Sequence, residues 1–245
     1  MEMRDLRLNI VNATLKSGEG HIPSAFSILD ILWVLYDRVL KPRDHFILSK
    51  GHGALALYSV LAEKGKINKN ELENFAMLGS RLGSHPDSLL VPGVEASTGS
   101  LGHGLAIGVG MALAHKINDC SGRIYVLVGD GECQEGEIWE ASRIANENSL
   151  DLTLIIDYNK THPDENLIDK LLAFGWFTRT SDGHDHEAIY KSFYMPIGPM
   201  AIIFKTIKGK GCKTFEESPN EWHHRAPKDD EVQMIKDEIG IWNNA

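Results

Sequence analysis

The chain has 245 residues, and its 42% hydrophobic and 24% charged content is ordinary for a soluble globular protein. A formal net charge of −9 argues against a nucleic-acid-binding protein, which would normally carry a basic footprint. Three scattered cysteines, a charged N-terminus without an apolar signal core, and the lack of an apolar stretch long enough for a bilayer favour a cytoplasmic protein without a membrane partner.

Helix-type and strand-type patterns follow one another along the chain, whose length suits one sizeable α/β domain or two small ones. Apolar residues spaced three and four apart predict helices, and short β-branched apolar runs predict strands. In chain order, helices are expected at residues 3–16, 27–39, 54–64, 70–78, 105–114, 137–148, 185–194 and 228–242. Strands are expected at residues 44–48, 123–128, 152–156, 174–180 and 200–206.

The most informative stretch is residues 123–160, which is predicted to form a strand, a helix and a second strand. A right-handed crossover makes such strands parallel neighbours, so the residues that follow them meet at one edge of the sheet. Asp130 follows the first strand and Asn159 the second. Carboxylate and amide oxygens suit Mg²⁺ or Ca²⁺, which often complete their shell with phosphate oxygens. The pair predicts a metal-bridged diphosphate site, although by itself it is equally typical of an ordinary Asp-Gly turn and a strand-end Asn.

The run GDGECQEGEIWEA from residue 129, followed by IDYNK from residue 156, resembles the signature of thiamine diphosphate (ThDP) enzymes in its transketolase form. The resemblance implies that the side chains of Asp130 and Asn159 and the backbone carbonyl of Thr161 bind the metal ion. It also implies cofactor contacts from the neighbours of Asp130, which are Gly129, Gly131 and Glu132. The segment after Asn159 departs from the family pattern, because only twelve residues, 161–172, precede the AFGW run.

A glycine-rich stretch, STGSLGHG at residues 97–104, resembles the (S/T)TGxLGxG segment of transketolases. Glycines at the start of a helix let backbone N–H groups approach a phosphate. The resemblance implies that the backbone of Gly99, Ser100 and Leu101 lies against the cofactor; close helix packing is the other interpretation of the small residues that follow. Glu135, in QEGE, matches the family glutamate that reaches across the subunit interface, and it also suits a helix N-terminus.

Four histidines lie in segments that resemble transketolase motifs: His21 in SGEGHIPSA, His52 in SKGHG, His85 in GSHPD and His223 in WHHRAP. Taken alone, an isolated histidine such as His21 or His85 would be an ordinary structural, surface or turn residue. The resemblance implies that His52 and His223 contact cofactor and substrate, that His85 faces the reacting carbon and that His21 assists proton transfer. His224 is the alternative to His223. The SGEGHIPSA loop matches its family counterpart imperfectly.

Two further segments match recurring family turns, GHD at residues 183–185 and KGKG at residues 208–211. No catalytic role is expected for the histidine of the first turn. Most lysines around the second turn are expected in a solvated loop.

The matching segments run in family order from about residue 5 to residue 240. They imply an α/β fold with a parallel central sheet and helices on both faces, formed by one diphosphate-binding domain over residues 1–245. The implied cofactors are ThDP and Mg²⁺ (or Ca²⁺), and the implied reaction moves a two-carbon ketol unit from a ketose, or ketose phosphate, to an aldose. A C-terminal partner subunit is expected to supply the pyrimidine-binding domain, in a heterotetramer. The alternatives are a specialised ThDP-dependent ketol or acyl transferase subunit of sugar or secondary metabolism, and a non-catalytic scaffold subunit.

Overall fold

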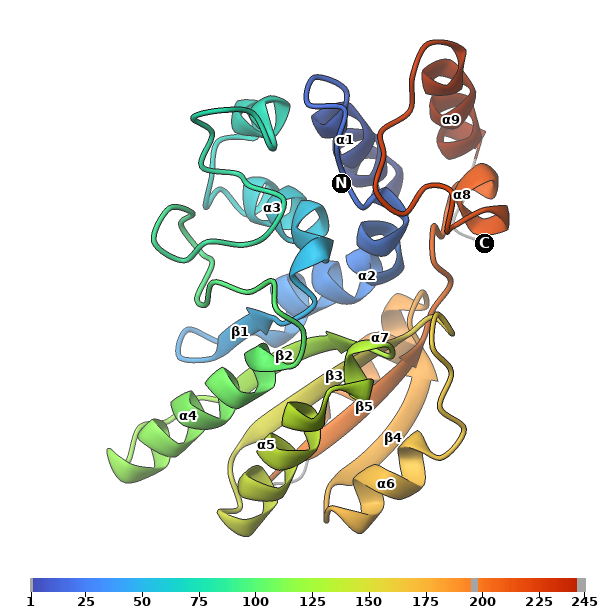
Figure 1. The fold of residues 1–245 in the computed structure, drawn as a ribbon. Helices are drawn as coiled ribbons and strands as arrows, with labels where there is room; N and C mark the ends of the chain where they lie inside the picture. The colour runs from blue at the N-terminus through green and yellow to red at the C-terminus, as the bar shows by residue number, and fades with distance from the viewer. Residues whose placement is uncertain (1, 195–197, 242–245) are drawn as a thin grey trace.

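The computed structural model describes residues 2–194 and 198–241, whose centre is a five-stranded parallel sheet (Figure 1). Its strands lie in the order β1-β2-β3-β5-β4, and each neighbouring pair is parallel. The strands are β1 (His45–Leu48), β2 (Ile124–Gly129), β3 (Leu152–Tyr158), β4 (Phe177–Asp182) and β5 (Met200–Lys205). The three inner strands are almost fully buried and rich in Val, Ile and Leu, as strands covered on both faces require. The predicted α/β class and parallel sheet are confirmed.

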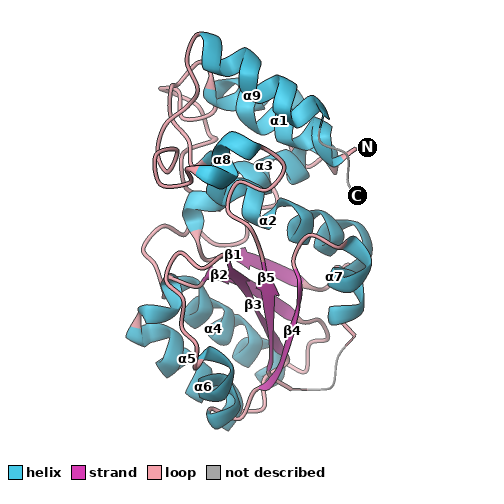
Figure 2. Ribbon diagram, turned by 90° about the vertical axis from the view of Figure 1, so that its right-hand side faces the viewer, coloured by secondary structure: helices cyan, strands magenta, loops and turns pink. Residues whose placement is uncertain are grey.

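Helices cover both faces of the sheet, with α4, α5 and α6 on one side and α7 on the other (Figure 2). On the α7 side, α2 lies next to the sheet, and α1, α3, α8 and α9 form a further layer (Figure 1). The helices are α1 (Met3–Thr14), α2 (Ile22–Val34), α3 (Ala54–Glu63), α4 (His103–Ile117), α5 (Gly136–Glu147), α6 (Leu167–Ala173), α7 (His186–Ser192), α8 (Lys213–Glu217) and α9 (Asp230–Ile241).

The two faces of the sheet belong to two separate hydrophobic cores, because successive strand residues point to opposite sides. Leu127 and Ile155 join the core formed with α1, α2, α3, α7 and α9. Val126 and Ile156 join the core formed with α4, α5 and α6. The pairing of β2 with β3 places Gly129 opposite Asp157, so the segments that carry Asp130 and Asn159 leave the sheet at the same edge.

Three predicted helix boundaries were wrong. Residues 70–78 form no α-helix but a short 3₁₀ segment, η3 (Lys69–Asn74), because the backbone turns at Ala76, which has a φ of 54°. The helix expected at 27–39 begins earlier, at Ile22, since Pro23 is tolerated in a first turn, and it ends in a π-helical turn, η1 (Leu35–Val39). The sequence also missed α6, which lies inside the shortened segment 161–172 at its C-terminal end.

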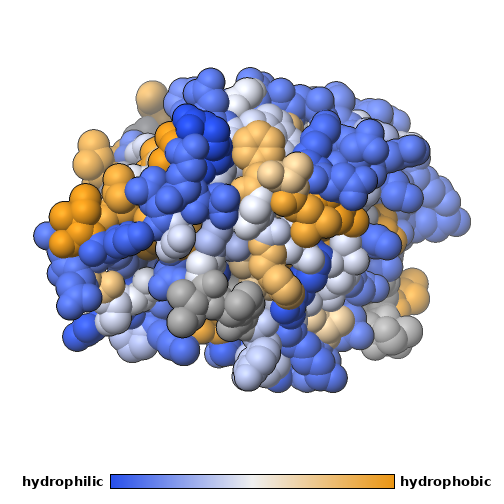
Figure 3. Space-filling model, turned by 90° about the horizontal axis from the view of Figure 1, so that it is seen from below, coloured by the Kyte–Doolittle hydropathy of each residue, from blue (hydrophilic) through white to orange (hydrophobic). Residues whose placement is uncertain are grey.

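Within residues 2–194 and 198–241, no helix is long and apolar enough to cross a membrane. Figure 3 shows the face seen from below, where apolar side chains form several separate patches among hydrophilic ones. Scattered apolar surface of this kind is ordinary for a folded domain. Elsewhere, Leu78 and Leu89 are almost fully exposed in the long connection between α3 and α4.

Candidate active site

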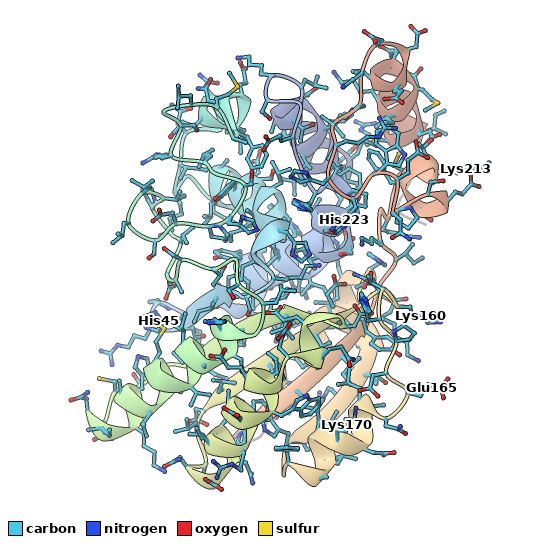
Figure 4. The ribbon with its side chains drawn as sticks, viewed as in Figure 1. His45, Lys160, Glu165, Lys170, Lys213 and His223 are labelled. Carbon is cyan, nitrogen blue, oxygen red and sulfur yellow. The ribbon has the colours of Figure 1, made fainter. Side chains whose placement is uncertain are left out.

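Four histidine rings come together above the carboxyl ends of the strands. His21 precedes α2, His52 lies in the 3₁₀ turn η2 (Gly51–Gly53) after β1, and His223 and His224 lie between α8 and α9. The centroid of the His21 ring is 5.5 Å from that of His52, 5.1 Å from that of His223 and 4.6 Å from that of His224. Figure 4 shows His223 over this end of the sheet and Lys160, which follows Asn159, beside it. Segments more than 200 residues apart thus share one site.

His85 approaches the same site from the connection between α3 and α4. A Cβ atom placed on Gly51 would lie 3.0 Å from His85 Cδ2, and one placed on Gly99 would lie 3.4 Å from it. The imidazole therefore rests against two glycines because neither carries a side chain. Tyr58 Oη donates a hydrogen bond to the backbone oxygen of His85, 3.0 Å away, and fixes the turn.

The site keeps its central histidines neutral. Burial, with the nearby His224 and His223, lowers the pKa of His21 to about 3. Burial and the Lys50 ammonium lower the pKa of His52 to about 2, and burial and Lys208 also lower the pKa of His223. A neutral imidazole has one donor and one acceptor nitrogen, so at neutral pH these rings are able to hydrogen-bond hydroxyl and carbonyl groups and to accept a proton.

The glycine-rich loop before α4 is tied to β1 and β2 through Glu132, which is buried. One oxygen of Glu132 accepts hydrogen bonds from Ser49 Oγ and from the N–H of Gly102, which is 2.8 Å away, and the other accepts from the N–H of Gly129 at 3.2 Å. Gly102 has a φ of 92°, a conformation that favours glycine. Glu132, expected to contact the cofactor, thus places its carboxylate among protein donors that hold this loop.

The backbone that precedes α4 is accessible at the positions predicted to face the cofactor. Ser100 is exposed, and Gly99 and Leu101 are partly exposed. Glu135 is exposed at the start of α5, next to Gly102, and its side chain makes no capping hydrogen bond. The loop and Glu135 therefore form one open surface beside the histidines.

Asp130 has the features of a metal ligand. Its Oδ1 accepts a hydrogen bond from the N–H of Gly131 at 2.8 Å, whereas its Oδ2 is buried and has no hydrogen-bond partner among the described residues. Burial and the negative charge of Asp157 raise the pKa of Asp130. An unpaired buried carboxylate oxygen is costly, and a bound cation would satisfy it.

Asn159 and Thr161, the other expected ligands, lie at the end of β3. Asn159 Oδ1 accepts hydrogen bonds from the N–H of Thr161, at 3.1 Å, and from Thr161 Oγ1. Asn159 Nδ2 donates to Asp157 Oδ2 at 2.9 Å, which turns the amide oxygen away from Asp157. The described residues contain no group of three His, Cys, Asp or Glu side chains suited to a metal. One carboxylate, one amide and one backbone carbonyl would not form such a group, and these hard oxygen ligands suit Mg²⁺ or Ca²⁺.

The sequence did not reveal the buried ion pair beneath these residues. Lys50 Nζ lies 2.6 Å from Asp157 Oδ2, and both side chains are almost wholly buried. Asp157 also accepts hydrogen bonds from Ser27 Oγ, at 2.8 Å, and from Thr206 Oγ1. Burial by itself would raise the pKa of Asp157, but Lys50 and these donors lower it. The polar end of the otherwise apolar run LTLIID was the signal available in the sequence.

Lys208, expected in a solvated loop, is a second buried cation in the site. Its side chain is 8% exposed, and its Nζ lies 3.5 Å from His223 Nδ1. Burial and the positive charge of Lys50 lower the pKa of Lys208. Two lysines thus give this end of the sheet a positive charge that suits a phosphorylated ligand. Since Lys208 contacts His223, the structure also favours His223 over His224 as the histidine facing that ligand.

The fold, the site and a family comparison together define the class of protein. The family model described as "Transketolase, thiamine diphosphate binding domain" matches residues 2–245. The chain is accordingly a ThDP-binding domain of the transketolase type.

Individual relatives narrow this class. The first of two subunits of apulose-4-phosphate transketolase from Phocaeicola vulgatus is 37% identical over 95% of this chain and 90% of that protein. The 6-deoxy-6-sulfo-D-fructose transketolase subunit SqwG of a Clostridium species is 39% identical over 82% of each chain. The solved transketolase of Campylobacter jejuni has a TM-score of 0.87 and 30% identity, and the match covers 96% of this chain but only 41% of that one. The chain therefore belongs to the transketolase family, as an N-terminal, ThDP-binding subunit, and the resemblance seen in its motifs is confirmed.

Proposed function

We propose that this chain is the diphosphate-binding half of a split transketolase that moves a two-carbon ketol unit from a ketose, or ketose phosphate, to an aldose. The main support is one juxtaposition at the carboxyl ends of β1, β2 and β3. Neutral histidines, two buried lysines and the unpartnered Oδ2 of Asp130 meet there. Histidines suit proton movement on sugar hydroxyls, and the cations and carboxylate suit a metal-bound diphosphate.

The proposed cofactor is ThDP with Mg²⁺, or Ca²⁺ in its place. When bound, ThDP supplies the nucleophilic carbon for ketol transfer, while the protein binds and orients it. Asp130, Asn159 and the carbonyl of Thr161 would hold the metal ion. The residues that would hold the diphosphate and thiazolium are His52, Gly99, Ser100, Leu101, Gly129, Gly131, Lys208 and His223, with Glu132 keeping their backbone in place.

The histidines divide the remaining work. His21 and His52 are neutral at pH 7 and are able to take up a proton from a sugar hydroxyl or donate a hydrogen bond to a developing alkoxide. His85, resting on Gly51 and Gly99, would orient the substrate carbon beside the cofactor. His223 would bridge diphosphate and substrate, because it contacts Lys208 on one side and His21 on the other.

We infer that the rest of the active site lies on a C-terminal partner subunit. This chain, one domain over residues 1–245, spans only 41% of the C. jejuni transketolase, and its site is open beside Ser100 and Glu135. The partner would contribute the pyrimidine-binding domain and its activating glutamate. Glu135 would reach across to a second copy, which gives a cytoplasmic heterotetramer.

A narrower assignment has specific support from the relatives. The separate subunits that match most of their length carry names with unusual sugars, apulose-4-phosphate and 6-deoxy-6-sulfo-D-fructose. Both names describe anionic sugars. The second candidate is therefore a specialised transketolase subunit that acts on a modified, anionic ketose rather than on a common pentose phosphate.

An assay of the mixed subunits tests the proposal. The chain, the product of the neighbouring reading frame that carries a pyrimidine-binding domain, ThDP and Mg²⁺ are combined, and ketol transfer between a panel of ketose phosphates, sulfo-sugars and aldoses is followed. Activity that requires both chains is expected. Activity of this chain alone would refute the split site, and no activity with any donor, despite ThDP binding, would favour the scaffold alternative.

A further inference from the structure

A buried carboxylate outside the histidine cluster connects three parts of the chain. Asp30, in α2, is 1% exposed. Its Oδ2 is 2.7 Å from Arg7 NH2 and 2.9 Å from His184 Nδ1, and its Oδ1 is 3.1 Å from His186 Nε2. Burial alone would raise the pKa of Asp30, but Arg7 and the two histidines lower it, so the carboxylate is charged.

The hydrogen bonds of His184 determine its tautomer. Its Nε2 is 2.9 Å from the backbone nitrogen of Ile207, which is able only to donate. Nε2 must therefore be the acceptor, and Nδ1 must carry the proton that His184 donates to Asp30. Asp30 thus holds the imidazole with its acceptor nitrogen aimed at the segment that follows β5.

That segment carries Lys208, and it is held on both sides of the lysine. The N–H of Ile207 donates to His184, the N–H of Gly209 donates to the backbone oxygen of Pro23 at 3.0 Å, and Arg7 Nε donates to the backbone oxygen of Lys210 at 2.8 Å. Figure 1 shows the segment rising beside α2 toward α8. Both Arg7 and His184 are bound to the same oxygen of Asp30.

We propose that His184, oriented by Asp30, is a positioning residue that fixes the Ile207–Lys210 backbone so that Lys208 points at the diphosphate. This inference rests on the proposed function, because it assigns the ligand of Lys208. It gives a role to the GHD turn at residues 183–185. Asp30 lies on the helix that begins after His21, so the same carboxylate sets the distance between that histidine and Lys208.

Two isosteric substitutions separate the two nitrogens of His184. The amide nitrogen in His184→Asn occupies the Nδ1 position and still donates to Asp30, but nothing replaces Nε2. The amide oxygen in His184→Gln reaches the Nε2 position and accepts from Ile207. His186→Asn is the matched control, because His186 binds the same carboxylate and makes no hydrogen bond to the Lys208 segment.

The test measures the dissociation constant of ThDP with Mg²⁺ in the assembled two-subunit protein, by titration calorimetry. His184→Asn should weaken binding about tenfold, equivalent to about 1.4 kcal/mol, because a buried N–H loses its acceptor. His184→Gln and His186→Asn should stay within about threefold of the unaltered protein. In a Lys208→Met background, His184→Asn should add almost nothing, since its effect passes through that lysine.

The outcomes distinguish this inference from the proposed function. Equal losses in His184→Asn and His186→Asn, or a full further loss in the Lys208→Met background, would overturn the positioning role while ThDP binding by the unaltered protein stands. Failure of the unaltered protein to bind ThDP would overturn both. Thermal unfolding of each variant without cofactor identifies a general loss of folding, and His184→Gln, which also lacks the imidazole, then decides between the two.

Discussion

Lys50→Met should expose the cost of a charge that is buried without its partner. In the native chain, Lys50 Nζ is 2.6 Å from Asp157 Oδ2, and neither side chain reaches solvent appreciably. The substitution keeps the volume of the side chain and removes the ammonium group. Asp157 is left with donors from Ser27, Thr206 and Asn159, which soften the loss.

The expected magnitude follows from that arrangement. Removing one partner of a buried ion pair typically costs about 3 to 5 kcal/mol of unfolding free energy. Because three hydrogen-bond donors remain on Asp157, we expect the lower end, about 3 kcal/mol. Lys16→Met is the matched control: Lys16 Nζ is 2.9 Å from Glu73 Oε2, but both side chains are more than half exposed, and the loss should be below about 1 kcal/mol.

The pH dependence of the loss has a defined sign. Lys50 depresses the pKa of folded Asp157 below its ordinary value of 3.8, so this carboxylate adds stability above that value and loses it as the pH falls through the folded pKa. In Lys50→Met, burial dominates and raises the folded pKa instead. The variant should therefore be most impaired near about pH 7, with a deficit that shrinks as the pH is lowered toward about 5.

The assay is urea unfolding of the cofactor-free chain at several pH values, followed by circular dichroism. Adding Asp157→Asn to Lys50→Met should restore at least half of the lost stability, since the uncompensated charge is gone. A deficit below about 1 kcal/mol, or one that does not change with pH, would refute the reasoning.

Three further predictions concern the rest of the site. Asp130→Asn should leave the unfolding free energy of the cofactor-free chain equal or higher, because burial and Asp157 already penalise its charge, yet weaken Mg²⁺-dependent ThDP binding at least about tenfold; equal ThDP affinity would remove Asp130 from the metal site. Gly104→Ala should destabilise the chain by about 1 to 3 kcal/mol, because a Cβ would lie 2.4 Å from Ser49 Cβ, whereas Gly110→Ala in the same helix meets nothing within 4 Å and should add about 0.5 to 1 kcal/mol in urea unfolding; similar effects would contradict the close packing of α4. The rings of His21 and His52 should not titrate by NMR between about pH 5 and 8, and because a lowered histidine pKa favours the folded state only above the unfolded value of 6.5, the chain should lose stability as the pH falls below it; titration of either ring near 6.5 would disprove the buried, neutral pair.

Local pattern was sufficient for the central strand–helix–strand unit. The apolar runs before Asp130 and Asn159 predicted β2 and β3, and right-handed crossover then predicted that both segments leave the sheet at one edge, as observed. The expected helix at 70–78 failed for a tertiary reason. Phe75 and Leu82 are buried through a turn at Ala76, which leaves Leu78 exposed, and the local sequence does not show that this turn is preferred to a continuous helix.

The electrostatic floor of the site was beyond local pattern. Lys50 and Asp157 are 107 positions apart, and each alone reads as an ordinary polar residue at a strand end. Lys208 likewise sat in a basic run that resembled a solvated loop, and only the packing of the segment after β5 against α2 shows that it is buried. The role inferred for His184 depends on three chain segments meeting at Asp30, which no spacing in the sequence encodes.

Titration of ThDP into the assembled subunits, with Mg²⁺ and then with a chelator, tests the central claim most directly. A metal-bridged diphosphate site shared between two chains predicts tight binding only when both chains and the cation are present, and loss of that binding in Asp130→Asn. Binding of equal strength in the presence of chelator, or by the partner chain on its own, would contradict it.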